Sequence, residues 1–174
     1  AQSKHAIEVS GLGFTLNAPP FHYTGISFFN AIYNPSFNKT NETRRMWLNK
    51  FKANGINVIR VWAQWDNGQG FVDTCPSCTL YQKDGQLRSD HLNALKKIIQ
   101  SADERDMVVL FVLFQRESWN ENIRLTDEAS DRAVKSVTEE LKPFRNVVFQ
   151  IWNEFDNRTI DYLNIIKAID SARL

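Results

Sequence analysis

The stretch Val147-Val148-Phe149-Gln150-Ile151-Trp152-Asn153-Glu154 decides how this chain folds. Its first six residues are almost all apolar or β-branched, which is typical of a strand buried on both faces of a parallel sheet. The strand ends in Asn153 and Glu154, and a carboxylate at that rim must be paired or desolvated. We therefore expect Glu154 to lie in the loop after the strand, where barrel enzymes keep their catalytic groups.

An alternative interpretation places Glu154 in the first turn of the following helix, where the helix dipole favours an acid. The helical spacing of apolar residues begins later, within residues 158–174, at Ile160, Leu163, Ile166 and Ile169. This later start favours the loop position for Glu154.

Working outward, strand-like and helix-like segments alternate along the rest of the chain. Core strands are expected at residues 23–28, 56–63, 107–114 and 147–152. Helices are expected at residues 40–54, 89–103, 127–141 and 158–174. Ser89 and Thr126 are the predicted caps of the second and third helices. In the first helix the spacing predicts a buried face of Met46, Trp47 and Phe51, with Leu48 as a further candidate.

This alternation predicts an α/β fold of parallel βα units with right-handed crossovers. We expect a TIM-barrel or (β/α)8 type, with only about the first four βα units present in this chain. Residues 1–174 are predicted to form a single domain, with residues 1–20 as an opening β-hairpin or plug. A doubly wound nucleotide-binding sheet is the alternative, but no glycine-rich phosphate loop follows any of the strands.

The composition sets further bounds. The 174 residues are 43% hydrophobic and 12% aromatic, enough for a sizeable core. The net charge of +1 is spread without blocks, so no nucleic-acid partner and no membrane association are expected. The histidines lack metal-site spacing, and we expect no metal and no cofactor. The chain begins Ala1-Gln2, as a protein does after removal of a signal peptide, and we therefore expect a secreted or periplasmic protein.

The two cysteines form the motif Cys75-Pro76-Ser77-Cys78. Neither a helix signal, as in thioredoxin-like sites, nor a second ligand pair, as in zinc sites, accompanies it. We interpret it as a local loop staple or two thiols, and export would favour the disulfide.

Two motifs, Asn57-Val58-Ile59-Arg60 and Ile151-Trp152-Asn153-Glu154, resemble the cellulase-like family 5 of glycoside hydrolases and its barrel clan. The resemblance implies cleavage of β-linked poly- or oligosaccharides by a retaining double displacement. It implies that Glu154 is the general acid/base and that Asn153 donates to the sugar 2-hydroxyl. It also implies that Arg60 positions the second carboxylate, a Glu on a seventh strand that this sequence does not contain. Retaining hydrolysis requires two carboxyl groups about 5–5.5 Å apart.

The length limits that interpretation. A full barrel takes about 250 residues, so we expect this chain to be a fragment of a larger enzyme. The alternatives are that it pairs with a second half-barrel or closes the sheet as a homodimer. The competing functional class is a non-catalytic carbohydrate-binding or half-barrel assembly protein.

Aromatic residues near the predicted strand ends are candidates for sugar contacts, because sugar faces pack on aromatic rings. Trp65 and Trp119 lie in polar loops and are the preferred candidates, followed by Trp62 and Phe29. For any one of these rings, packing in the core is the alternative. Arg60 is also a predicted substrate-site residue, with a structural ion pair as its alternative.

Overall fold

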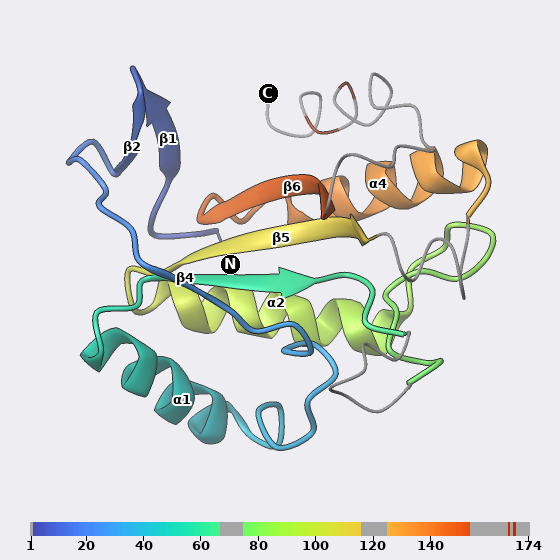
Figure 1. Cartoon of the computed structure of the whole chain (residues 1–174), viewed down its shortest axis with the longest axis horizontal. Coiled ribbons are helices and arrows are strands. Elements are labelled where there is room, and N and C mark those ends of the chain that lie inside the picture. The colour runs from blue at the N-terminus through green and yellow to red at the C-terminus, as the bar shows by residue number, and fades with distance from the viewer. Residues whose placement is uncertain (1, 67–74, 116–124, 154–166, 168, 170–174) are drawn as a thin grey trace.

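A computed structural model of the chain describes residues 2–66, 75–115, 125–153, 167 and 169. Its main sheet has four strands: β3 (Gly25–Ser27), β4 (Val58–Trp62), β5 (Val108–Gln115) and β6 (Val147–Asn153). They lie in the order β3-β4-β5-β6, and each neighbouring pair is parallel (Figure 1). The predicted succession of parallel βα units is therefore confirmed, and the first core strand is shorter than expected. The predicted last helix lies mostly outside the described residues.

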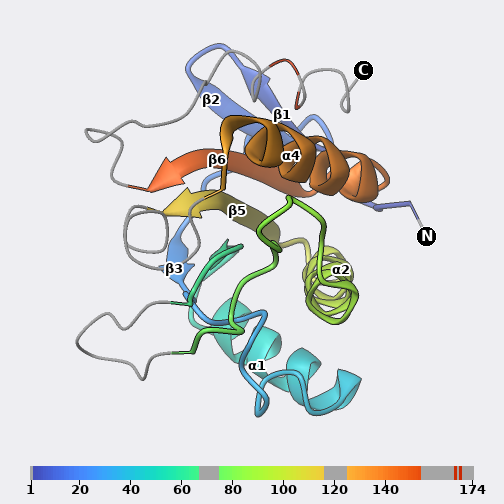
Figure 2. The ribbon, with the colours of Figure 1, turned by 90° about the vertical axis from the view of Figure 1, so that its right-hand side faces the viewer.

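Three helices cover one face of this sheet (Figure 2). They are α1 (Asn41–Ala53), α2 (Ser89–Asp103) and α4 (Asp127–Leu141). Alternate strand residues such as Ile59 and Val61 are fully buried in the core cluster that these helices share with the sheet. The opposite face carries Val58 and Leu110, which line a cavity of ≈240 Å³ with residues of the opening segment. Among the described helices, none has the length and apolarity that a bilayer crossing demands.

Two of the three described helices begin after a threonine cap, of which the Thr126 cap was predicted. The Thr40 hydroxyl accepts a hydrogen bond from the Thr43 N–H (3.0 Å), and the Thr126 hydroxyl accepts one from the Ala129 N–H (3.2 Å). The predicted Ser89 cap is wrong, because Ser89 is already the first residue of α2. The cap position belongs to Arg88, whose extended backbone donates its N–H to the Leu80 carbonyl.

The predicted buried face of α1 is also wrong in part. Met46 and Trp47 are 46% and 39% exposed. The buried stripe passes through Leu48, which was a candidate for this face, and through Arg44, which was not; the two lie one turn apart. Arg44 enters this stripe because its guanidinium donates to the side-chain oxygen of Asn41 (2.9 Å), whereas Trp47, which the apolar spacing places on the buried face, is exposed.

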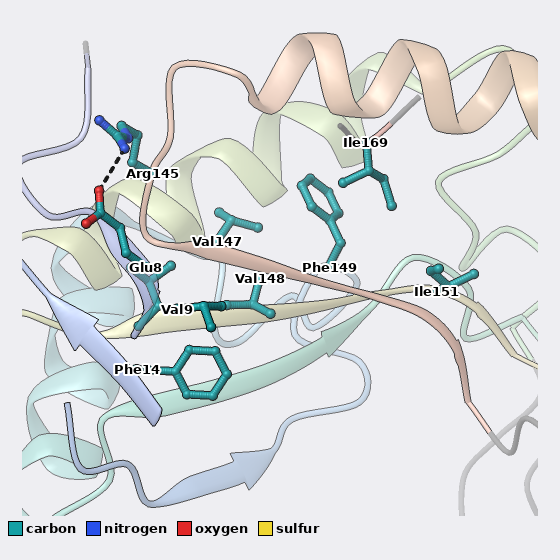
Figure 3. Close-up of a pocket in the computed structure, with 10 residues that line it drawn as sticks. Glu8, Val9, Phe14, Arg145, Val147, Val148, Phe149, Ile151 and Ile169 are labelled. Atoms are coloured by element: carbon teal, nitrogen blue, oxygen red, sulfur yellow. Dashed lines mark hydrogen bonds and ion pairs between the residues drawn. The ribbon is translucent and has the colours of Figure 1, made fainter. Parts of the chain in front are cut away.

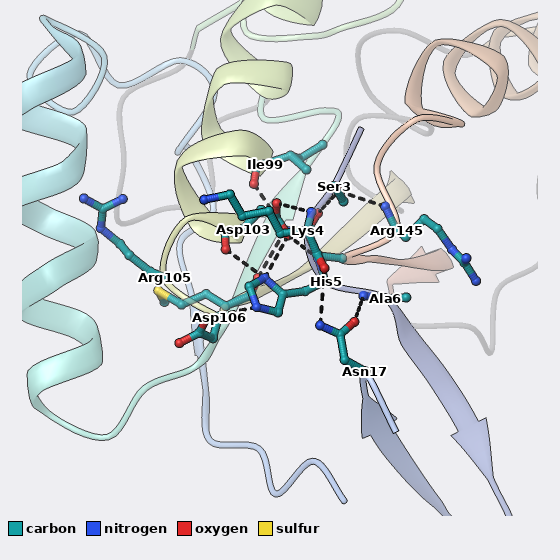
Figure 4. A network of polar contacts seen from close by, with 12 residues as sticks. Ser3, Lys4, His5, Ala6, Asn17, Ile99, Asp103, Arg105, Asp106 and Arg145 are labelled. Carbon is teal, nitrogen blue, oxygen red and sulfur yellow. Dashed lines mark hydrogen bonds and ion pairs between the residues drawn. The ribbon is translucent and has the colours of Figure 1, made fainter. Parts of the chain in front are cut away.

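The opening residues form a small antiparallel hairpin of β1 (Ile7–Ser10) and β2 (Gly13–Leu16). A polar network holds the segment before the hairpin against the end of α2 (Figure 4). The Asp103 carboxylate accepts the backbone N–H groups of Lys4 (2.7 Å) and His5 (3.0 Å). The His5 ring nitrogens lie 3.2 Å from Asp103 Oδ1 and 3.0 Å from Asp106 Oδ1. The amino-terminal segment is thus anchored near the amino-terminal ends of the strands.

Asn146, immediately before β6, is fully buried and belongs to the same edge of the sheet. Its side-chain amide donates to the carbonyls of Ile99 (3.2 Å) and Met107 (3.1 Å). Its side-chain oxygen accepts from the Ser3 hydroxyl (2.9 Å). One residue therefore connects α2, the start of β5 and the amino terminus.

Two features organise the connection between β4 and α2. Cys75 and Cys78 form a disulfide. Gly85 has φ +83° in a tight turn, and a Cβ built there would lie 2.2 Å from the carbonyl oxygen of Ala129 in α4. Only glycine fits this turn, because both its backbone conformation and its close approach to α4 exclude a side chain.

Candidate active site

Arg60 in β4 is the centre of the candidate site. Its side chain joins β4 to β6, which is about 90 residues later in the sequence. Its Nε–H donates to Gln150 Oε1 at 2.9 Å, and its Nη2–H donates to Asn153 Oδ1 at 2.8 Å. Both acceptors lie on β6, and β5 separates the two strands in the sheet. The fold therefore brings together two predicted site residues, Arg60 and Asn153, at the carboxyl-terminal side of the sheet.

The two contacts on β6 come from residues that a regular strand places on opposite faces. Residues two or four apart share a face of a regular strand, but Gln150 and Asn153 are three apart and both reach Arg60. The register pairs Val112 with Gln150 and Gln115 with Asn153. Asn153, the last residue of β6, therefore turns its side chain back over the face that carries Gln150.

The Arg60 guanidinium also stacks on an aromatic ring. Its central carbon lies 4.1 Å from the centroid of the Trp62 ring, a cation–π arrangement. Burial lowers the pKa of Arg60 below its ordinary value, yet an arginine remains charged at any working pH. Among the described residues no carboxylate forms an ion pair with Arg60, so its charge is held there by neutral amides and a ring.

Three predicted aromatic residues lie together beside Arg60. The rings of Phe29 and Trp65 are stacked, with centroids 4.8 Å apart and an interplanar angle of 14°. The Phe29 and Trp62 centroids are 4.7 Å apart. Trp62 and Trp65 are only 1% and 5% exposed, whereas Phe29 is half-buried. Phe29 is therefore the ring of this cluster with surface left for a ligand.

Two tyrosines, Tyr33 (partly buried) and Tyr81 (fully buried), lie near the end of β4 and the loop that follows. The Tyr33 hydroxyl donates to the carbonyl of Ala63, next to the strand end. Burial raises the pKa of Tyr33 well above its ordinary value, and burial also raises the pKa of Tyr81. Neither phenol can act as a base near neutral pH, so both are structural supports of the site.

The remaining predicted site residues, Glu154 and Trp119, lie outside the described residues. Asn153 is the last residue of β6, and Glu154 follows it directly in the sequence. Gln150 was not predicted, although it is the one polar residue in the otherwise apolar run before Trp152. That interruption was a usable signal, since a buried polar group needs a partner.

A sequence profile of the cellulase family, glycosyl hydrolase family 5, matches residues 15–172. The chain belongs to this family. The structure search agrees on the fold, which corresponds to the amino-terminal half of a family 5 (β/α)8 barrel. A search of curated proteins found no match.

Three solved structures illustrate the likeness. A Bacteroides vulgatus protein, provisionally described as a glycoside hydrolase, aligns with a TM-score of 0.76 at 18% identity, over 97% of this chain and 36% of its own. An endocellulase from Pyrococcus horikoshii, in complex with cellotetraose, aligns at 0.64 and 19%, over 98% and 55%. A β-1,4-D-mannanase from Cryptopygus antarcticus aligns at 0.61 and 18%, over 87% and 44%. The chain thus spans between about a third and just over half of the length of these proteins.

Proposed function

We propose that this protein is a glycoside hydrolase that cleaves β-linked poly- or oligosaccharides. One observation carries the proposal: Arg60 holds Asn153 at the carboxyl-terminal end of β6, directly before Glu154. This is the end of a parallel sheet at which barrel enzymes assemble their sites. Membership of family 5 and the endocellulase and mannanase folds support the same class of reaction.

In the proposed mechanism Glu154 protonates the leaving glycosidic oxygen and then activates water. The reaction retains configuration through a covalent intermediate on a second Glu, which we expect on a later strand of the barrel. Arg60, whose charge no described carboxylate neutralises, would keep that second acid ionised by lowering its pKa. Asn153 uses its oxygen to accept from Arg60, which leaves its NH₂ group to donate to a sugar hydroxyl.

The aromatic cluster supplies the surface of the proposed sugar site. Phe29 is half-buried between Trp62 and Trp65 and presents the ring on which a sugar face can pack. We assign Trp62 and Trp65 to the support of that ring, and Trp119 remains a predicted contact from a polar loop. Cellulose-like and mannan-like chains are the substrates to test first, because an endocellulase and a mannanase are among the similar folds.

The partner that the fold needs is the rest of a barrel. Among the described strands, β6 pairs with β5 alone, so its second edge is open. A groove of ≈480 Å³ runs beside that edge and is mostly apolar, with the Glu8–Arg145 ion pair (3.2 Å) at one end (Figure 3). A following strand would cover this groove. We propose that a second half-barrel, in the same polypeptide or a second copy, closes the sheet, and that the protein is secreted or periplasmic, as the disulfide supports.

The test is hydrolysis of aryl β-glucosides and aryl β-mannosides by the native protein, compared with Glu154→Gln. Loss of a general acid/base lowers the rate by about 10²–10⁴-fold, and substrates with poor leaving groups should be affected most. Glu139→Gln, an exposed change on α4, is the matched control and should leave turnover unchanged.

Two other outcomes would contradict the proposal. Equal turnover by native protein and Glu154→Gln would remove the assigned role of Glu154. Oligosaccharide binding without any turnover by the native protein would instead establish the carbohydrate-binding alternative.

A further inference from the structure

Gln150 connects the side chain of Arg60 to the backbone at the end of β6. Its Oε1 accepts from Arg60 Nε at 2.9 Å, and its Nε2 donates to the Trp152 carbonyl at 3.0 Å. Arginine only donates and a carbonyl only accepts, so the two contacts demand the same orientation of the Gln150 amide. Both functions of the amide are used, and its orientation is determined by its neighbours.

This contact determines how the guanidinium lies. The guanidinium is planar, with five N–H donors in a rigid fork. Gln150 holds the Nε edge while the Trp62 ring lies 4.1 Å from the central carbon, so an edge and a face are both restrained. With these fixed, the Nη2 donor can only point where Asn153 Oδ1 receives it, at 2.8 Å.

The orientation of Asn153 follows in turn. Because Arg60 requires an acceptor, the oxygen of the Asn153 amide faces it and the NH₂ group faces away. A freely turning Arg60 would leave this amide without a preferred orientation. A chain of fixed contacts therefore runs from Gln150 through Arg60 to the proposed sugar-binding group of Asn153.

We propose that Gln150 is a positioning residue of the active site, a neutral clamp that orients Arg60 and through it Asn153. The inference rests on the proposed glycosidase function and adds a residue to it. A neutral glutamine suits this position better than a glutamate for a chemical reason. A carboxylate at position 150 would accept from Arg60, but it would also neutralise the guanidinium and repel the Trp152 carbonyl oxygen. Glutamine supplies the acceptor and the donor while leaving the charge of Arg60 available to a catalytic carboxylate.

The first experiment reads the clamp without any activity. In the isotope-labelled native protein, NMR should show an Arg60 Nε–H that is protected from exchange with water and Asn153 side-chain amide signals displaced from those of a solvent-exposed asparagine. Gln150→Leu should remove the protection and shift the Asn153 signals. Gln150→Glu should keep the Arg60 protection, because its carboxylate still accepts. Gln82→Leu, an exposed glutamine in a turn, is the control and should change neither signal.

The second experiment measures kcat, KM and the pH–rate profile of the same proteins with an aryl β-glycoside. Gln150→Leu should lower kcat by about 10- to 100-fold, the scale of a misplaced reacting group, with a smaller effect on KM. Gln150→Glu should move the acidic limb of the profile to higher pH, because a neutralised Arg60 no longer lowers the pKa of the ionised acid. A merely structural glutamine would leave this limb in place.

The two experiments separate the inference from the proposed function. Unchanged Arg60 and Asn153 signals in Gln150→Leu would overturn the clamp, whether or not the protein is a hydrolase. Changed signals together with unaltered kcat and pH profile would overturn its role in positioning. If the native protein binds cellotetraose or mannotetraose without hydrolysis, the function fails, and weaker sugar binding by Gln150→Leu than by Gln82→Leu would still support the clamp.

Discussion

Where the strands begin, at the amino-terminal edge of the sheet, polar side chains have their hydrogen-bonding groups paired with neighbouring groups. Where the strands end, at the carboxyl-terminal edge, polar side chains have N–H donors that no described residue accepts. Asn57 uses both the oxygen and the NH₂ group of its side chain: the oxygen accepts from the Thr24 N–H (2.9 Å), and the NH₂ group donates to the His22 carbonyl (2.8 Å). Asn146 likewise uses its oxygen and its NH₂ group on buried partners. Both asparagines immediately precede a strand, so both connect one strand start to its neighbours.

Arg60 and Asn153 at the other edge behave differently. Within the described residues, Arg60 commits two of its five N–H donors, and the NH₂ group of Asn153 donates to no residue there. Polar groups that a fold does not satisfy internally are candidates for ligand contacts. The same residue type, asparagine, thus has its amide fully paired at one edge of this sheet, whereas at the other edge it leaves available the NH₂ group that the proposed function assigns to a sugar hydroxyl.

The largest effect, on activity, should come from a change of Asn153 at the carboxyl-terminal edge. Asn153→Asp keeps an acceptor for Arg60 but replaces the free NH₂ donor with a second oxygen. We expect kcat/KM for an aryl β-glycoside to fall about 10²–10³-fold, the cost of removing one preorganised donor from a transition state. Thermal unfolding should change little. Asn93→Asp, an exposed change on α2, is the control for the added charge. Equal activity of Asn153→Asp and native protein would show that this amide does not touch substrate.

A change at the amino-terminal edge should have the opposite result, with lower stability and retained activity. Asn146→Leu leaves the buried carbonyls of Ile99 and Met107 without their donor. We expect the free energy of unfolding to fall by about 3 kcal/mol, since each buried group left unsatisfied costs about 1–3 kcal/mol. Urea titration followed by circular dichroism measures it, with Asn93→Leu as the exposed control. Activity at a temperature where the variant is folded should persist. Loss of activity by the folded variant would show that Asn146 does more than stabilise the fold.

A smaller loss is expected where the amino-terminal segment is anchored. Asp103→Ala removes the acceptor of the Lys4 and His5 N–H groups. Hydrogen bonds to a charged group contribute about 1.5–3 kcal/mol, and we expect a loss near the lower figure, because the first residues can detach. Limited proteolysis should then cut near residue 5 while the sheet resists. Uniform resistance would show that the hairpin stays in place without Asp103.

The smallest effect should be a dependence on pH at the same edge. The hydrogen bond from Lys52 is the main cause that lowers the pKa of Asp106 (2.7 Å). A carboxyl whose pKa is lowered by folding stabilises the folded state at pH values above its unfolded pKa of about 4. This stabilisation is lost as the pH falls through the pKa of the folded state. Both side chains are about half exposed, so Lys52→Met should cost only about 0.2–1 kcal/mol at pH 7. The two proteins should converge as the pH falls below the folded value of Asp106, and a difference that stays constant as the pH is lowered would exclude the ion pair as the cause.

Much of the fold follows from local sequence signals, because the strand and helix periods differ and Thr126 supplies a predicted cap that the structure confirms. The misplacements have physical reasons. Trp47 has the spacing of a buried residue, but Arg44 enters the core stripe through partners that helical spacing does not reveal. The Ser89 cap is misplaced by one residue because the extended Arg88 is tied to Leu80.

The candidate site was harder to predict than the fold. Arg60 and Asn153 were identifiable because each is a polar residue in or at the end of an apolar strand pattern, and because the motifs that contain them resemble family 5. Gln150 was missed because its partner lies two strands away in the sheet, and a one-dimensional pattern does not report which side chains meet across β5. Its meaning depends on Arg60, Trp62 and Asn153 at once, which is a property of the assembled sheet.

Gly85 limits how this protein can be recombined with its relatives. The turn that carries it belongs to the second βα unit, yet it touches the Ala129 carbonyl in the first turn of α4, in the third unit. Arg132 reinforces this junction by donating its Nε–H to the Asp84 carbonyl (2.7 Å). A chimera spliced between β5 and α4 would therefore need a donor helix with the same backbone path at that point, so these two units are exchangeable only as a pair.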